Sequence, residues 1–130
     1  MSSSARLRDR QVLDAQIEAL RVHVDRARDR EDVTADFARG ALKALGWVTA
    51  AGPGPLTGAL AVAPVALERI VAELAAAEDI IYGRSSRQRD YARGVEHALM
   101  WAQFATAAPP LSPSPQEASP LAGRTSGARR

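Results

Sequence analysis

The side chains of this chain best suited to chemistry are its two histidines, and neither stands in a reactive pattern. His23 and His97 both lack a second histidine or glutamate at the spacing of a zinc site such as H-E-x-x-H. The chain has no cysteine, which excludes disulfides, thiolate ligands and a cysteine nucleophile. The one glycine-rich loop is interrupted by Pro53 and Pro55, which lack the amide donors that a phosphate cradle needs. We therefore expect no catalytic residue, no metal and no cofactor, and a protein that is not an enzyme.

Arginine is the second candidate for binding chemistry. The densest cluster in the body surrounds one tyrosine and comprises Arg84, Arg87, Arg89 and Arg93. Its guanidinium groups could contact phosphate, and Arg39 with Arg93 could form twin contacts to an acidic partner. Both of these follow an aspartate by three residues, so a surface ion pair is the simpler interpretation. Residues 1–108 carry equal numbers of acidic and basic side chains, whereas a fold that grips nucleic acid normally has a basic face.

Arg39 and Arg93 belong to a stretch of sequence that occurs twice. Residues 36–48 return as residues 90–102, with more than half of the positions identical. Repeats of this kind define an architecture. Upstream the match is fainter, and it aligns the apolar residues Leu13, Ile17 and Leu20 with Leu67, Val71 and Leu74. The sequence therefore predicts an αα-hairpin used twice, with the repeated motif on the second helix of each.

On a helix, the motif places a large ring at each end of one face and two small residues between them. The two faces comprise Phe37, Gly40, Ala44 and Trp47, and Tyr91, Gly94, Ala98 and Trp101. A glycine inside a helix costs about 1 kcal/mol relative to alanine, so its presence in both copies suggests that another backbone comes close. We expect the two motif helices to cross near Gly40 and Gly94 about a pseudo-two-fold axis. The eight residues are interpreted as a packing motif.

Helical periodicity predicts an all-α, four-helix bundle-like body without strands. The expected helices span about 5–30, 32–50, 64–83 and 88–107, with Pro64 in the first turn of the third. They form one helical domain, 1–108, made of the hairpins 5–50 and 64–107. Residues 56–63 form an apolar connector with room for one helical turn. Residues 109–130, rich in Pro, Ser, Gly and Arg, are predicted to be a disordered tail.

The compartment follows from what the sequence lacks. The polar N-terminus has no apolar core of a signal peptide, and prolines break the longest weakly polar run, which excludes a membrane span there. We expect a cytoplasmic protein. Its richness in Ala, Gly, Pro and Arg resembles small accessory proteins of high-GC actinobacteria and their mobile elements.

Two functions stay open. The preferred one is a small helical interaction or accessory protein that binds a protein partner or forms a homodimer, because alanine-rich faces leave a thin core that self-association can complete. The alternative arises because residues 56–71 resemble a helix-turn-helix register, with Ala61–Val62 as the turn and Leu67–Val71 as the recognition helix. That resemblance implies a DNA-binding regulator, which would use this segment and the Arg84–Arg93 cluster.

Overall fold

The computed structural model describes residues 6–27, 33–83 and 88–111. Within these ranges the chain forms four helices and one two-stranded sheet, in the order α1 (Arg10–Arg26), α2 (Val33–Ala50), β1 (Gly52–Pro53), β2 (Leu60–Ala61), α3 (Leu67–Ile81) and α4 (Arg89–Ala102). The mostly helical architecture is confirmed, and the small sheet is an element that the sequence did not predict. Residues 112–130 of the expected tail lie outside the described residues.

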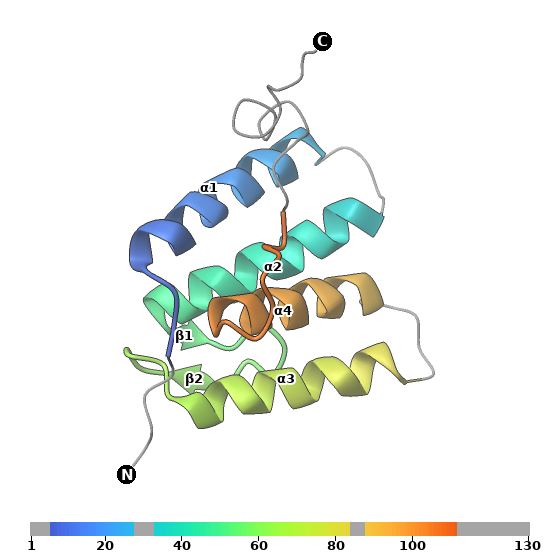
Figure 1. Cartoon of the computed structure of the whole chain (residues 1–130). Coiled ribbons are helices and arrows are strands. Elements are labelled where there is room, and N and C mark those ends of the chain that lie inside the picture. Colours follow the sequence, from blue (N-terminus) through green and yellow to red (C-terminus); the bar gives the residue numbers. More distant parts are fainter. Residues whose placement is uncertain (1–5, 28–32, 84–87, 112–130) are drawn as a thin grey trace.

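The two motif helices, α2 and α4, form the centre of the molecule. Figure 1 shows that they start on the same side and run in the same direction, while α1 and α3 run the opposite way. α1 packs on α2, α3 packs on α4, and the contact between α2 and α4 is the most extensive. All four helices contribute fully buried side chains to the core, among them Leu20, Leu45, Ile70, Val95 and Leu99.

The repeated glycines lie where α2 and α4 meet. A Cβ added to Gly40 would overlap the carbonyl oxygen of Tyr91, and one added to Gly94 would overlap the carbonyl oxygen of Phe37. Each glycine thus meets the residue three positions before the other glycine, so the two contacts are reciprocal. The close backbone approach that the repeated glycines predict is confirmed.

α1 begins at Arg10 and not near residue 5. The residues before it bind the end of α4 instead. The Arg8 N–H donates to the Ala102 carbonyl at 2.9 Å, and the Arg8 Nε donates to the Trp101 carbonyl at 2.6 Å. These carbonyls have no partner inside α4 because a helix leaves its last four carbonyls open. α1 ends at Arg26, and residues 28–30 of the expected helix lie outside the described residues.

α4 ends at Ala102 and not near Ala107. Phe104 has a left-handed φ of 67°. Its N–H donates to the Trp101 carbonyl at 3.0 Å, and the Ala105 N–H donates to the Met100 carbonyl at 2.7 Å. This pair of bonds is a Schellman turn, in which glycine normally takes the left-handed position. A phenylalanine there is no local signal for the end of a helix.

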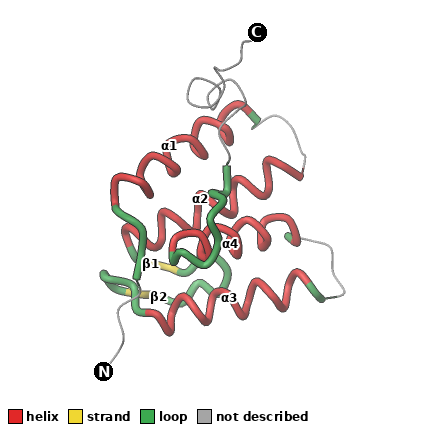
Figure 2. Tube along the Cα trace, viewed as in Figure 1, coloured by secondary structure: helices red, strands yellow, loops and turns green. Residues whose placement is uncertain are grey.

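α3 begins at Leu67 rather than at Pro64. Val65 is buried in the core, and the chain enters the helix only after this residue. The Ala63–Pro64 peptide bond is cis. The expected connector, residues 56–63, contains β2, which pairs in antiparallel fashion with β1 just before it, with Gly52 opposite Ala61. Figure 2 shows these two short strands beside the start of α3.

The buried face of α3 also differs from the one that the repeat predicts. Its buried residues are Ile70, Glu73, Ala77 and Ile81. Leu67 and Val71, which the alignment placed in the core, are exposed. α3 is turned about its axis so that Glu73 reaches the connector. The predicted alignment of the first helix with α3 therefore does not match the face that α3 buries.

The chain after α4 folds back over the body (Figure 1). Leu111 packs against the core, and its N–H donates to Oε1 of Gln16 on α1 at 2.7 Å. Earlier in the same segment, the Thr106 carbonyl accepts from Nη2 of Arg8 at 3.0 Å. Leu111, near the start of the predicted tail, therefore contacts the body. We call residues 103–111 the C-terminal strap.

Candidate functional site

The eight residues of the predicted packing motif lie in or beside the core. Six of them are buried: Gly40, Ala44, Trp47, Gly94, Ala98 and Trp101. The two leading rings, Phe37 and Tyr91, are half-buried. Trp47 uses its indole Nε1 to donate to the Gly52 carbonyl at 3.2 Å, which ties α2 to β1. Of the eight, Gly40 and Gly94 lie where α2 and α4 meet.

The candidate arginines are engaged locally. Arg39 pairs with Asp36 at 2.8 Å and Arg93 with Asp90 at 3.7 Å, each within its own helix. Arg89 is half-buried and donates to the Gly83 carbonyl at 3.2 Å. Arg84 and Arg87 lie outside the described residues. The structure thus brings only Arg89 and Arg93 of the cluster together on α4, with an aspartate between them.

The helix-turn-helix geometry expected for residues 56–71 is absent. Residues 52–66 contain β1, β2 and loops, and no helix precedes α3 in that stretch. A recognition helix needs a preceding helix that crosses the DNA backbone. The resemblance in this segment was therefore misleading, because β2 occupies the place of the expected turn.

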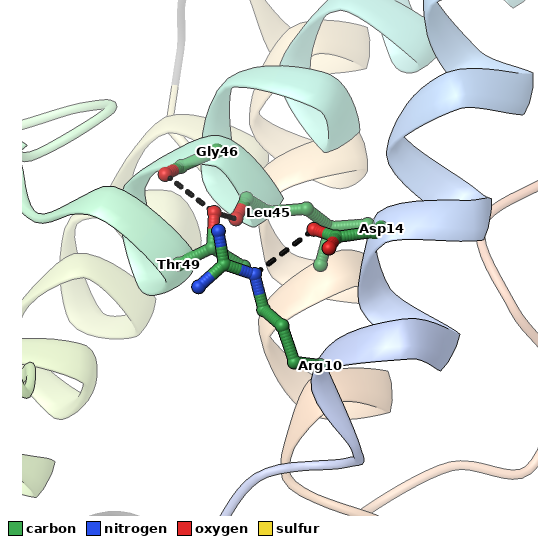
Figure 3. Close-up of polar contacts among 5 residues, drawn as sticks. All are labelled: Arg10, Asp14, Leu45, Gly46 and Thr49. Atoms are coloured by element: carbon green, nitrogen blue, oxygen red, sulfur yellow. Dashed lines mark hydrogen bonds and ion pairs between the residues drawn. The ribbon is translucent and has the colours of Figure 1, made fainter.

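The side of the molecule that α1 and α2 share carries further polar contacts, all within single helices. Figure 3 shows the ion pair between Arg10 Nε and Asp14 at 3.0 Å, on exposed side chains of α1. It also shows Thr49 of α2, whose hydroxyl lies 3.1 Å from the Leu45 carbonyl and 3.0 Å from that of Gly46. Such contacts satisfy local groups and contribute little to stability.

His97, one of the two histidines, lies on α4 between α2 and the C-terminal strap. Its ring is half-buried and meets the ring of Phe37 edge-on, with 5.8 Å between centroids. Its Nε2 lies 2.7 Å from the carbonyl oxygen of Ala108 in the C-terminal strap. In the part of the chain that the structure describes, no group of three acidic or histidine side chains could hold a metal ion.

Glu73 is a buried carboxylate that sequence reasoning missed. Only 2% of it is exposed. Its Oε1 accepts from the N–H groups of Leu56 at 2.8 Å and Thr57 at 3.1 Å, and its Oε2 accepts from the Thr57 hydroxyl. A Cβ on Gly54 would overlap Oε2. Glu73 therefore clamps the connector onto α3. A glutamate within the apolar stripe of α3 was the signal that could have revealed it.

Tyr91 lies near this carboxylate, on α4. Burial raises the pKa of its hydroxyl, and the negative charge of Glu73 raises that pKa further. Both effects disfavour the phenolate. Tyr91 thus stays protonated well into the alkaline range, which suits a packing residue better than a base.

The C-terminal strap and the connector are held in a similar way. A Pro-Leu pair follows each motif helix, as Pro55–Leu56 and as Pro110–Leu111. The leucine N–H donates to Glu73 in the first case and to Gln16 in the second. Both leucines also pack against the core. Each outer helix thus receives the segment that follows the motif helix of the other half.

The largest exposed apolar side chains near a groove lie around β2 and the start of α3. Leu60 is 73% exposed, Val62 is 82% exposed and Val71 is 54% exposed, and Leu67 lies beside them on α3. A groove of about 490 Å³ separates residues 60–64 from α3. Its other wall comprises Ala66, which precedes α3, and Glu68, Arg69 and Ala72 of α3. We call the exposed apolar residues and this groove the β2–α3 surface. Sequence reasoning missed it because the repeat placed Leu67 and Val71 in the core.

Two wider observations complete the description. None of the described helices is both long and apolar enough to cross a bilayer. Comparison of the chain with protein-family models, with curated proteins and with solved structures found no match.

Proposed function

We propose that this protein is a non-enzymatic interaction protein that binds another protein chain through the β2–α3 surface. The observation that carries the proposal is the exposure of Leu60 and Val62, which line one groove, together with the exposure of Val71 on α3, the helix that contributes to the other wall of that groove. Single exposed apolar residues are ordinary, but a contiguous apolar patch bordered by polar residues marks an interaction site. Here Glu68 and Arg69 supply the polar border.

The energetics favour a partner at this surface. Burying a valine or leucine side chain fully gains about 1.5–3 kcal/mol. Several such residues on one face can therefore offset part of the several kcal/mol that association costs in lost motion. The connector that carries Leu60 and Val62 is held in place by Glu73, so a partner would meet a surface that is already formed.

The other function that the sequence left open, DNA binding, has less support. For DNA, the described part of the basic cluster consists of Arg89 and Arg93, and Arg93 is paired with Asp90. Affinity for DNA depends on several phosphate contacts made by unpaired cations.

We further propose that the body is a duplicated αα-hairpin. The support is threefold. The glycine contacts between α2 and α4 are reciprocal, α1 packs on α2 as α3 packs on α4, and Gln16 and Glu73 each bind the leucine N–H of a Pro-Leu segment. In this interpretation the β1–β2 hairpin is an addition to one half only, and the proposed binding surface is built on that addition.

The test is an affinity capture from an extract of the native host. The matched control is the Val62→Ser/Val71→Ser variant, which removes apolar groups from the surface and leaves the core intact because both side chains are more than half exposed. We expect at least one protein to be retained by the wild type and lost with the variant. Identical sets of captured proteins would refute the proposed surface.

A further inference from the structure

We propose that the partner of the β2–α3 surface is an extended segment of another protein, which adds to the free edge of β2 as a third strand and places a carboxylate against Arg69. This inference rests on the proposed function and names the chemistry of its partner. An exposed sheet edge recognises such a segment through backbone hydrogen bonds, while pockets for its side chains supply the specificity.

The hydrogen-bond pattern between β1 and β2 shows which backbone groups are turned outward. The Gly54 N–H donates to the Ala59 carbonyl at 2.9 Å, and Gly52 stands opposite Ala61 two residues further along. Bonded pairs alternate with non-bonded pairs along an antiparallel ladder, so both of these pairs are bonded. Leu60 lies between them, and its own N–H and C=O therefore point away from β1.

These two groups of Leu60 have no partner in the part of the chain that the structure describes. Pro53, which stands opposite Leu60, has no N–H to donate, and no hydrogen bond from outside the sheet reaches the Leu60 backbone. Figure 2 shows β2 between β1 and the start of α3, and the groove separates residues 60–64 from α3. The free edge of β2 is therefore on the side of the groove.

The side chains of this segment suit an added strand that carries apolar residues. Ala61 packs against the core, so its neighbours Leu60 and Val62 point to the other face, where they are exposed. Apolar side chains of an added strand would pair with them across the ladder. The edge is short because Pro64 offers no donor, so a segment of a few residues is enough to cover it.

Arg69 sets the charge of the segment. It lines the groove from α3, and among the described residues it has no ion pair. Glu68 beside it also lines the groove but already has an interaction partner within the chain. The charge that the groove leaves open is therefore positive, which favours an acidic side chain among the apolar residues of the segment.

The first measurement is the panning of a phage-displayed library of random peptides, about seven residues long as strands commonly are, on the immobilised full chain. We expect enriched sequences in which an aspartate or glutamate lies among β-branched or aromatic residues. Arg69→Glu should weaken the binding of the corresponding synthetic peptide about tenfold. Arg21→Glu, a charge reversal on an exposed site of α1, is the matched control and should leave that binding unchanged.

The second measurement separates backbone recognition from side-chain recognition at one residue. Leu60→Ala and Leu60→Pro both remove the leucine side chain, but only the proline also removes the N–H. Because this N–H points away from β1, proline is tolerated at such an edge position. We expect the peptide to bind about tenfold more weakly to Leu60→Pro than to Leu60→Ala, since one hydrogen bond is lost.

A third measurement tests the same bonds from the side of the peptide, and it holds even if Leu60→Pro does not fold. Two versions of the peptide carry backbone N-methyl groups at alternate residues, one at odd positions and the other at even positions. Only one edge of an added strand faces β2, so one version should lose its binding and the other should keep it.

The outcomes separate this inference from the proposed function. A library without binders overturns the strand addition, as does a peptide that tolerates both patterns of N-methylation, and enriched peptides without an acidic residue overturn the role of Arg69. A dimer of the full chain that Leu60→Pro abolishes would assign the edge to a second copy and overturn the proposal too. In each case the capture experiment with Val62→Ser/Val71→Ser still decides whether another protein uses the surface.

Discussion

Two regions of the molecule differ in the size of the residues that they place at the contact or in solvent: the crossing of α2 with α4, and the β2–α3 surface. At the crossing, the side chains are smallest where the backbones meet, at Gly40 and Gly94. At the surface, large apolar side chains such as Leu60 and Val62 stand in solvent. Since buried packing tolerates added volume poorly and exposed positions tolerate change well, the same size of substitution should have very different effects in the two regions.

The largest effect is expected at the crossing. Gly94→Ala would place a methyl group on the Phe37 carbonyl oxygen, which a backbone can relieve only by moving. Overpacking of this kind costs about 3 kcal/mol at the upper end of its usual range. The measurement is the free energy of unfolding from urea denaturation.

The matched control for this glycine lies on the same pair of helices. A Cβ on Gly46, within α2, would meet nothing within 4 Å. Gly46→Ala should therefore stabilise the protein by up to about 1 kcal/mol through helix propensity. Equal effects of the Gly94 and Gly46 substitutions would show that the crossing imposes no size limit.

A smaller loss is expected where the connector is clamped under the β2–α3 surface. Glu73→Ala leaves the N–H groups of Leu56 and Thr57 without their acceptor. An unsatisfied, partly buried donor costs about 1–3 kcal/mol, so we expect a loss of about 2 kcal/mol in unfolding free energy. Glu73→Gln keeps an oxygen for both donors and should lose less than half as much. A Gln variant as unstable as the Ala variant would mean that charge, and not these bonds, holds the connector.

Substitutions on the β2–α3 surface should hardly change the free energy of unfolding. Val62→Ser/Val71→Ser changes side chains that are 82% and 54% exposed, so its free energy of unfolding should stay within about 0.5 kcal/mol of the wild type per position. The check is thermal or urea unfolding at a concentration where the chain is monomeric. A loss of several kcal/mol would show that these valines belong to the core.

The smallest effect on stability is expected at Tyr91, and it appears only at alkaline pH. The pKa of Tyr91 is raised by burial and by Glu73, so the folded protein binds this proton more tightly than the unfolded chain, whose tyrosines ionise near pH 10. The stability that Tyr91 contributes is complete below about pH 10 and is lost as the pH rises from there through the folded pKa. Tyr91→Phe should therefore lose less stability than the wild type above pH 10. Parallel pH profiles of unfolding for the two proteins would contradict this.

The contrast between the two regions also explains what the sequence could predict. The crossing was predictable because a local pattern carries it: two glycines at equal places in two copies of one motif indicate a close approach of two backbones. The burial of Trp47 and Trp101 follows from the same helical face. Helical periodicity likewise predicted the helices themselves, although not all of their ends.

The remaining features depend on contacts between distant residues. α4 ends at Ala102 because Phe104, two residues later, takes a left-handed conformation, which no local sequence rule indicates. The face that α3 buries depends on Glu73 reaching Leu56, and the contact of Leu111 with the body depends on Gln16 accepting from its N–H. The β2–α3 surface follows from that rotation of α3, so it was hidden for the same reason.

A double-mutant cycle on Gly40→Ala and Gly94→Ala tests the crossing most directly, through the free energies of unfolding of both single variants and the double variant. Because the two contacts are reciprocal, a separation of α2 from α4 that accommodates one methyl group should make room for the second. We predict that both single variants are destabilised and that the double variant loses at least about 0.5 kcal/mol less than the sum of the two losses. Additive losses, or single variants as stable as the wild type, would contradict the crossing on which the fold is built.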